Sequence, residues 1–326
     1  MVIAVTGATG FLGGRVVESL ANRGHDVLAF GRRPPAAFRY AGLAAYTRWD
    51  ITEGRCPPLG SRAVDAVVHC AGTVTDWGSA AEFEAVNVRG TEAALASFPQ
   101  NARFVHVSTS SVYDHRRPAG AIQETAPYAR RPLNDYVRTK IAAEQAVLRS
   151  GRPSLILRPH AIYGPGETKL LPRLLAARRF GRLLAVGDGR NRISLTHVDN
   201  LVQVIERAIE PGSPTGIFNV ADSEAEPLGG LLRALLLAFG LAPRVVYLPR
   251  VVAWPIATTM ESAFRAARTK RPPLLTRYIV AQLASECVLD IRQAQNLLGY
   301  QPQRGYNDGF REVAHPSTSP ALGGIS

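Results

Sequence analysis

Val2-Ile3-Ala4-Val5-Thr6-Gly7-Ala8-Thr9-Gly10-Phe11-Leu12-Gly13-Gly14 is the stretch that decides the fold of this chain. Its apolar start predicts a buried strand, and residues 15–23 after it predict an amphipathic helix. A strand, a glycine turn and a helix in this order are the context of a dinucleotide-binding fingerprint. Gly7 permits the tight turn, Gly10 lets the main chain approach a pyrophosphate, and Gly13 lets helix and strand pack closely. We therefore predict a dinucleotide site at the start of this helix, where free N–H groups face the phosphates.

The segment after the second predicted strand, residues 25–31, indicates which dinucleotide is preferred. An NAD site usually has an acidic residue there, which binds the ribose 2′-hydroxyl. This chain has Arg32 and Arg33 instead, and no Asp or Glu follows before Asp50. Because two guanidinium groups suit a 2′-phosphate, the sequence predicts NADP as the preferred cofactor, with NAD as the alternative. Asp50 is predicted to contact the adenine edge, and its alternative role is an ordinary loop cap.

Tyr136 and Lys140 are one turn apart on the same face of a predicted helix over residues 134–149. An ammonium group beside a phenol lowers the phenol's pKa from its ordinary value of about 10. A tyrosine tuned in this way exchanges a proton with an alcohol or a carbonyl near neutral pH. Lys140 is one of only three lysines in a chain with 38 basic residues, and an arginine would not replace its compact, tunable charge. The pair predicts acid–base catalysis, although the same spacing occurs in many helices that have no such role.

Composition and charge fit a cytoplasmic enzyme. With 326 residues and 46% hydrophobic content, the chain can build two lobes around a sizeable core. Its net charge of +12 raises the question of nucleic acid, but the basic residues are scattered and no helix-turn-helix or zinc motif occurs, so we expect no such partner. The three cysteines lack metal-ligand spacing, which predicts reduced thiols and no metal site. No apolar run reaches 18 residues, so we expect no integral membrane span, while the apolar residues 251–256 leave peripheral membrane contact open.

Predicted strands and helices alternate through the first half of the chain. Strands are expected at residues 65–70, 103–108 and 154–158, and helices at residues 83–98 and 134–149. This order predicts an α/β fold, a Rossmann-type doubly wound parallel sheet with its site at the carboxyl ends of the strands. After Pro159 the elements become shorter and apolar helices such as residues 228–239 appear, which predicts a smaller C-terminal substrate-binding lobe.

We therefore predict three regions. Residues 1–160 form a dinucleotide-binding Rossmann domain, and residues 161–315 form mainly the substrate-binding lobe, with some segments that return to the sheet. Residues 316–326 are rich in Ser, Pro and Gly and are expected to be a disordered tail.

Seven short motifs, in this order, resemble the extended short-chain dehydrogenase/reductases of the NAD-dependent epimerase/dehydratase superfamily. They are the glycine turn, His69-Cys70-Ala71-Gly72, Asn87-Val88-Arg89-Gly90-Thr91, Ser108-Thr109-Ser110-Ser111-Val112-Tyr113, Tyr136 with Lys140, Arg158-Pro159 with Tyr163-Gly164-Pro165-Gly166, and His197-Val198-Asp199-Asn200. Each motif is weak alone, but the whole series in the expected order is specific. The resemblance extends from the glycine turn to about Phe310.

The resemblance implies a role for each matching residue. Tyr136 would be the general acid when a carbonyl is reduced and the base in the reverse direction, while Lys140 would lower the pKa of Tyr136 and bind the nicotinamide ribose. Thr109 would bind the reacting oxygen, with Ser110 as the alternative, and Asn87 would brace the active-site helix. The implied cofactor-binding residues are Gly7, Thr9, Gly10, Phe11, Leu12, Gly13, Arg32, Arg33, Asp50, Ile51, Cys70, Ala71, Gly72, Tyr136, Lys140 and Pro159.

Asp76-Trp77-Gly78 and Val198-Asp199-Asn200 look like the 3β-hydroxysteroid dehydrogenase branch, which includes sterol dehydrogenases and bacterial 2-alkyl-3-oxoalkanoate reductases. Ser110-Ser111 stand where family dehydratases have Asp-Glu, and Asp114-His115 stand where the family commonly has Gly, which leaves the shape of the substrate-side loop open. The resemblance thus implies an NAD(P)-dependent oxidoreductase that interconverts a secondary alcohol and a ketone on an apolar small molecule, and it leaves a homodimer open.

Two other functions remain open at this point. One is a nucleotide-sugar 4-epimerase, in which Arg192 would bind the diphosphate of the substrate. The other is a non-catalytic NAD(P)-sensing regulator on the same fold. The presence of Thr109, Tyr136 and Lys140 argues against the regulator, because such proteins commonly lose the tyrosine.

Overall fold

A seven-stranded parallel sheet forms the centre of the computed structural model, which describes residues 1–58, 62–114, 120–168, 170–269 and 271–315. The strand order is β13-β7-β5-β4-β1-β2-β3. The strands are β1 (Val2–Thr6), β2 (Asp26–Gly31), β3 (Ala45–Arg48), β4 (Ala66–His69), β5 (Arg103–Val107), β7 (Ser154–Pro159) and β13 (Gly216–Val220). The chain reverses its direction of winding between β1 and β4, so the carboxyl ends of these strands form the crevice where doubly wound folds bind ligands.

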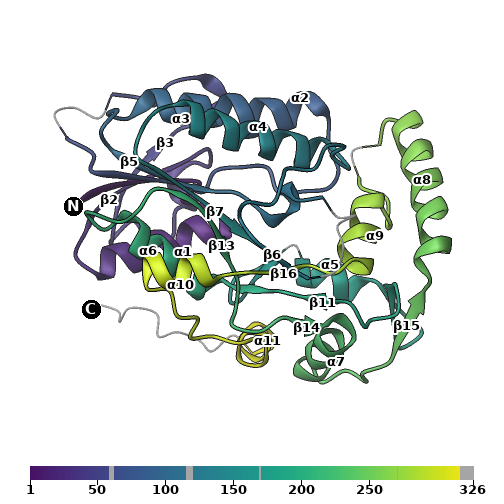
Figure 1. The fold of residues 1–326 in the computed structure, drawn as a ribbon. Helices are drawn as coiled ribbons and strands as arrows, with labels where there is room; N and C mark the ends of the chain where they lie inside the picture. Colours follow the sequence, from purple (N-terminus) through teal and green to yellow (C-terminus); the bar gives the residue numbers. More distant parts are fainter. Residues whose placement is uncertain (59–61, 115–119, 169, 270, 316–326) are drawn as a thin grey trace.

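Helices cover both faces of this sheet, as expected for parallel strands that are buried on both sides. One face carries α2 (Ala80–Phe83), α3 (Gly90–Ser97) and α4 (Asp135–Arg149), and the other carries α1 (Phe11–Asn22), α6 (Val198–Ile209) and α10 (Arg292–Leu298) (Figure 1). The predicted Rossmann-type fold is thereby confirmed. Among the described residues, no helix combines the length and apolarity needed to cross a bilayer.

The remaining elements form a lobe beyond the carboxyl ends of the strands. Its helices are α5 (Leu170–Ala176), α7 (Leu228–Ala238), α8 (Arg250–Ala266), α9 (Arg277–Ala284) and α11 (Tyr306–Ala314). A second sheet, in the order β15-β10-β9, consists of β9 (Arg178–Arg179), β10 (Arg182–Val186) and β15 (Val245–Leu248). Three two-stranded pairings involve β6 (Ala121–Ile122), β8 (Ile162–Tyr163), β11 (Arg192–Ile193), β12 (Thr196–His197), β14 (Glu226–Pro227) and β16 (Val288–Leu289). The predicted tail, residues 316–326, lies outside the described residues.

Two helices differ from the sequence-based expectation. The helix predicted over residues 83–98 begins earlier, at Ala80, because Ser79 and Glu82 form a capping box at its start. It then widens into a π-helical segment, Glu84–Arg89, before it continues as α3. The first helix begins at Phe11 rather than Arg15, so the last glycines of the turn are helical. The widened segment matters because it contains the predicted brace Asn87, and such segments often occur at functional sites.

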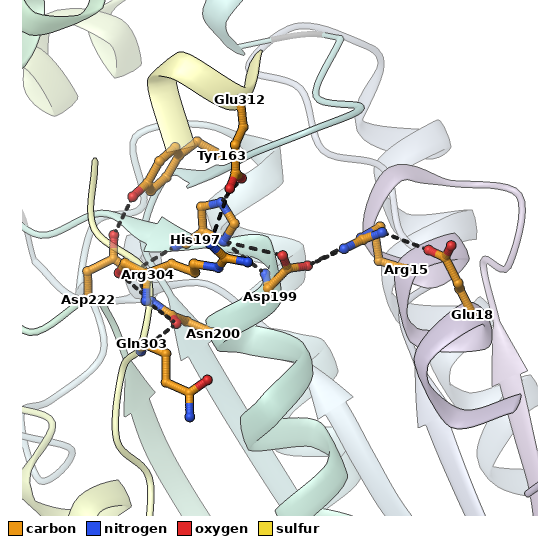
Figure 2. A network of polar contacts seen from close by, with 10 residues as sticks. All are labelled: Arg15, Glu18, Tyr163, His197, Asp199, Asn200, Asp222, Gln303, Arg304 and Glu312. Carbon is orange, nitrogen blue, oxygen red and sulfur yellow. Dashed lines mark hydrogen bonds and ion pairs between the residues drawn. The ribbon is translucent and has the colours of Figure 1, made fainter. Parts of the chain in front are cut away.

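A polar network joins the start of α6 to α1 and to α11, and it explains the His197-Val198-Asp199-Asn200 motif in structural terms (Figure 2). Arg15 of α1 donates to Asp199 Oδ1 at 2.6 Å, and His197 Nε2 lies 3.3 Å from Glu312 Oε2 of α11. Asp222 accepts hydrogen bonds from the main-chain N–H of His197, from Asn200 and from Tyr163. The motif therefore holds the C-terminal helix against the nucleotide-binding half.

A buried ion pair attaches α4 to the sheet. Arg158 Nη2 of β7 lies 2.6 Å from Glu144 Oε2 of α4, and the two side chains are 2% and 0% exposed. Burial acts to lower the pKa of Arg158, but the hydrogen bonds and charge of Glu144 outweigh it, so the pKa is raised. The guanidinium also lies over the rings of Tyr113 and Tyr128, and the Ser108 hydroxyl donates to the same carboxylate.

Replacing Glu144 by Gln would leave the buried Arg158 charge without a counter-charge. We expect the free energy of unfolding to fall by about 3–5 kcal/mol, measured by urea unfolding followed by circular dichroism. The control is Glu210→Gln, which removes an exposed ion pair with Arg207 and should cost less than about 1 kcal/mol. Equally small losses in both variants would mean that the buried pair does not hold α4 in place.

Candidate active site

The glycine turn forms a cradle between β1 and α1. Gly7 has φ +71°, and a Cβ there would lie 2.8 Å from the main-chain nitrogen of Ala71. A Cβ on Gly13 would lie 2.2 Å from the Gly7 carbonyl oxygen, so no side chain fits between helix and strand. Gly10 precedes α1 with no side-chain cap, and the first turn carries no acidic residue. The first N–H groups of α1 therefore face the crevice without side-chain partners, which suits a pyrophosphate.

Most of the other residues predicted to bind the cofactor lie at the carboxyl ends of β2, β3, β4 and β7. Cys70, Ala71 and Gly72 follow β4 directly, and Thr6 Oγ1 accepts a hydrogen bond from the Ala71 N–H at 3.3 Å. Burial raises the pKa of the Cys70 thiol to about 12, so this sulfur stays protonated. Pro159 ends β7 at the same edge of the sheet. The remaining predicted residues occupy the turn and the ends of β2 and β3; they are Thr9, Phe11, Leu12, Arg32, Arg33, Asp50 and Ile51.

Arg32 and Arg33 are exposed at the end of β2, and the structure adds a third arginine that sequence reasoning missed. Arg48 ends β3, and its Nε donates to the Arg32 carbonyl oxygen at 3.3 Å. Asp50 accepts from both the N–H and the hydroxyl of Thr52, which is the loop-cap contact named as its alternative role. Burial acts to raise the pKa of Asp50, but the bonds from Thr52 and the nearby charges of Arg32 and Arg48 lower it overall.

Tyr136 and Lys140 lie on α4 and are both buried, at 5% and 6% exposure. Thr109 lies two residues beyond the end of β5, and its hydroxyl is close enough to the Tyr136 phenol to oppose the rise in that group's pKa. The neighbouring Ser110 points elsewhere, since its Oγ lies 2.7 Å from His160 Nδ1. The geometry therefore brings Thr109, rather than the alternative Ser110, to Tyr136.

Lys140 does not act on Tyr136 as expected. Its Nζ donates to the Val107 carbonyl oxygen at 2.8 Å and lies 3.3 Å from His106 Nε2. Burial lowers the pKa of Lys140 to about 8, against the opposing charge of Glu144. Burial also raises the pKa of Tyr136 to about 12, and only the bond from Thr109 opposes the rise. The expected lowering of the tyrosine pKa by Lys140 is thus wrong, because the pKa of Tyr136 is raised and Lys140 is not among the causes that act on it.

Asn87 connects the widened helical segment to α4. Its Nδ2 donates to Thr139 Oγ1 at 3.1 Å, and its Oδ1 accepts from the Thr73 N–H at 2.8 Å. Thr139 lies between Tyr136 and Lys140 on α4, and Asn87 is only 2% exposed. These contacts are those that a brace of the active-site helix would need.

Tyr278 is a second tyrosine at the site that sequence reasoning missed. Its ring meets the Tyr136 ring edge-on, with centroids 6.1 Å apart at an angle of 89°, and its hydroxyl lies 2.9 Å from Ser111 Oγ. It lies in the first turn of α9, whose N-cap Thr276 donates to Asp76 Oδ2 at 2.6 Å.

The pocket beside these residues is small, about 40 Å³, and mixed in character. Its polar lining includes Ser110, Ser111, His160, Tyr278, Gln282 and Cys287, and its apolar lining includes Ile122, Leu133 and Val137. None of the apolar residues 228–256 lines this cavity. The leucines of α7 instead form the core of the lobe.

Arg192 lies at the protein surface, outside this pocket. Its Nη2 donates to the Ala225 carbonyl oxygen at 2.8 Å, and the residue is exposed. The guanidinium group that could have bound a sugar diphosphate is therefore hydrogen-bonded to the main chain instead.

Two curated relatives span nearly the whole chain. The 2-alkyl-3-oxoalkanoate reductase of Stenotrophomonas maltophilia is 33% identical over 333 residues, which cover 98% of this chain and 100% of the relative. The 4-hydroxy-2-methyl-3-oxo-4-farnesyl-3,4-dihydroquinoline-1-oxide ketoreductase of Stigmatella aurantiaca is 32% identical over 312 residues, or 94% of this chain and 93% of its own. A solved structure, UDP-glucuronic acid 4-epimerase from Bacillus cereus with NAD, covers 96% of this chain and 97% of its own with a TM-score of 0.71. At 22% identity, this structural similarity shows that the two proteins share a fold.

The family model that matches this chain describes the NAD dependent epimerase/dehydratase family and covers residues 3–221. That range includes the glycine cradle, Thr109, Tyr136 and Lys140, and it is more than half of the 326 residues. The chain belongs to the NAD-dependent epimerase/dehydratase family of extended short-chain dehydrogenase/reductases.

Proposed function

We propose that this protein is an NADP(H)-dependent oxidoreductase that interconverts a secondary alcohol and a ketone in a substrate of the 3-oxoalkanoate or 3β-hydroxysteroid type. The observation that carries the proposal is the Thr109 hydroxyl beside the buried Tyr136 phenol, at the same edge of the sheet as the glycine cradle. Two hydroxyl groups at one point can bind and protonate a carbonyl oxygen. The names of the two curated relatives, both ketone reductases, support the same chemistry.

In the proposed mechanism the cofactor transfers a hydride and side chains of the protein bind the substrate and transfer a proton. When bound, the reduced nicotinamide supplies a hydride to the carbonyl carbon. Thr109 and Tyr136 bind the carbonyl oxygen, and Tyr136 gives its phenolic proton as negative charge develops there. The raised pKa of Tyr136 keeps that proton in place before the reaction. Lys140 would bind the nicotinamide ribose, and Asn87 keeps α4 in position through Thr139.

The polar part of the pocket favours an oxoalkanoate over a steroid. Ser111 Oγ lies 3.2 Å from Thr109 Oγ1 and accepts from Gln282 Nε2 at 3.3 Å. These groups and the Tyr278 hydroxyl offer hydrogen-bond donors next to the point where the ketone would bind. A carboxylate one carbon away from the ketone would accept hydrogen bonds from them, whereas the apolar rings of a steroid offer no acceptor.

Tyr136→Phe should lower turnover by roughly 10²–10⁴, because the ring still packs but the transferable proton is lost. We expect the dissociation constant of the cofactor to change little, measured by quenching of protein fluorescence during titration. Val147→Ala, which removes a buried side chain of α4 outside the pocket, serves as the packing control. A Tyr136→Phe enzyme with more than about a tenth of wild-type turnover would remove Tyr136 from this role.

Arg32 and Arg33 are proposed to set the preference for NADP over NAD. Charge-assisted hydrogen bonds to a phosphate contribute about 1.5–3 kcal/mol each. The double variant Arg32→Ala with Arg33→Ala should therefore weaken NADP binding by at least about tenfold and leave NAD binding nearly unchanged. Arg55→Ala with Arg149→Ala removes two exposed arginines elsewhere and is the control for net charge. Tighter binding of NAD than NADP by the unchanged protein would contradict the proposal.

The substrate class is tested by cofactor oxidation with three groups of compounds, namely 2-alkyl-3-oxoalkanoates, steroid ketones and UDP-sugars. We expect the oxoalkanoates to give the highest kcat/KM. UDP-sugars should neither oxidise the cofactor nor protect the protein against heat, because Arg192 is bonded to the main chain. Epimerisation of a UDP-sugar without net consumption of cofactor would instead favour the 4-epimerase, the alternative in the same family.

A further inference from the structure

Phe180 is an aromatic side chain held fully in water at the tip of the hairpin between β9 and β10. It is 102% exposed and has φ +49°, a left-handed conformation that is uncommon for a residue other than glycine. Arg178 and Arg179 precede it and Arg182 follows it after one glycine. A large apolar group presented in this way, between cations, indicates contact with something other than water.

The outer face of the same small sheet continues this pattern. Leu184 of β10 and Val246 of β15 are directly paired across the sheet, and they are 46% and 41% exposed. Because side chains alternate along a strand, Arg182 and Arg244 lie on the same side as Leu184 and Val246. We call Phe180, Arg182, Leu184, Arg244 and Val246 the hairpin face. The opposite side of β10 is buried in the core of the lobe through Leu183 and Ala185.

The positive charge of this face is not neutralised. Arg182, Arg233 and Arg244 line one shallow hollow of about 380 Å³. None of the three forms an ion pair within the described part of the chain. The charge of Asp188 acts on Tyr247 in the lining of this hollow, and its Oδ1 accepts from the Arg190 N–H. The face therefore combines apolar side chains with an excess of cations.

The exposed apolar surface continues along the chain into α8, which begins two residues after β15 ends. Val251 and Val252, in its first turn, are 80% and 45% exposed. Figure 1 shows α8 along the outer edge of the lobe, with β15 leading into it. This is the segment for which the sequence left peripheral membrane contact open.

We propose that the hairpin face docks on an anionic membrane surface, with Phe180 at the boundary of the acyl chains and Arg182 and Arg244 on lipid phosphates. Exposed apolar side chains surrounded by cations fit a bilayer that carries negative headgroups. A second copy of the chain would bring like charges together, and a nucleic-acid backbone would bind the arginines but offer no partner to Leu184 and Val246. The proposal does not rest on the reaction that the enzyme catalyses.

The position of the face in the fold connects it to the active site. The end of β10 contacts α9, since a Cβ on Gly187 would lie 3.4 Å from Cα of Ala284. The same helix carries Tyr278 and Gln282 at the catalytic pocket. Docking through this face would therefore place the pocket near the surface from which an apolar substrate could leave the bilayer.

Flotation of the full-length protein with vesicles tests the proposal. At low ionic strength we expect binding to vesicles of phosphatidylcholine mixed with phosphatidylglycerol, and none to phosphatidylcholine alone. Phe180→Ser should reduce the partition coefficient by about tenfold or more. Arg182→Gln with Arg244→Gln should reduce it by about fivefold for each arginine. Thermal unfolding of each variant checks that it is folded.

Matched variants on other surfaces serve as controls. Leu148→Ser removes an apolar side chain of 48% exposure from α4, and Arg55→Gln with Arg149→Gln removes two exposed cations. Both should bind the vesicles like the wild type. The proposal would be overturned if Phe180→Ser floated like the wild type. It would also be overturned if the wild-type protein bound neutral and anionic vesicles equally, or bound duplex DNA in preference to anionic vesicles.

Discussion

The buried ion pair between Glu144 and Arg158 is the contact on which the active site depends. Glu144 lies one turn beyond Lys140 and two turns beyond Tyr136, so its attachment to β7 fixes the rotation of α4 about its axis. The same carboxylate accepts a hydrogen bond from Ser108, which directly precedes Thr109 at the end of β5. One buried charge therefore aligns both hydroxyl groups that meet at the site. Such a pair is costly to bury and more costly to break, which makes the alignment rigid.

A second set of polar contacts places the C-terminal lobe over this site. Asp76, in the loop after β4, accepts from Thr276 at the start of α9 and from Arg173 of α5. These contacts position Tyr278 against Tyr136, so a residue far along the chain completes the pocket. The first half of the chain carries Tyr136 and the glycine cradle, and both halves line the pocket, Ser110 and Ser111 from the first and Tyr278 and Gln282 from the lobe.

Short-range patterns in the sequence were sufficient to predict part of this arrangement. The glycine turn depends on local backbone geometry, and Tyr136 and Lys140 share a face because of the helical period, so both could be predicted. The direction of the Lys140 side chain could not be predicted, because it is set by contacts with Val107 and His106 on a separate strand. Arg48 and Tyr278 were missed for the same reason. The widened helix at Asn87 has no pattern of its own, and the polar pocket follows from how α9 packs.

If Thr109 and Tyr136 present a ketone for net reduction, NADPH that carries deuterium at both C4 positions should transfer one deuterium to the product. The product of a 2-alkyl-3-oxoalkanoate is analysed by mass spectrometry and NMR, together with the amount of cofactor oxidised. We expect one deuterium atom at the new carbinol carbon for each molecule of cofactor that is oxidised. Product without deuterium at that carbon, or turnover that leaves the cofactor unconsumed, would contradict this expectation.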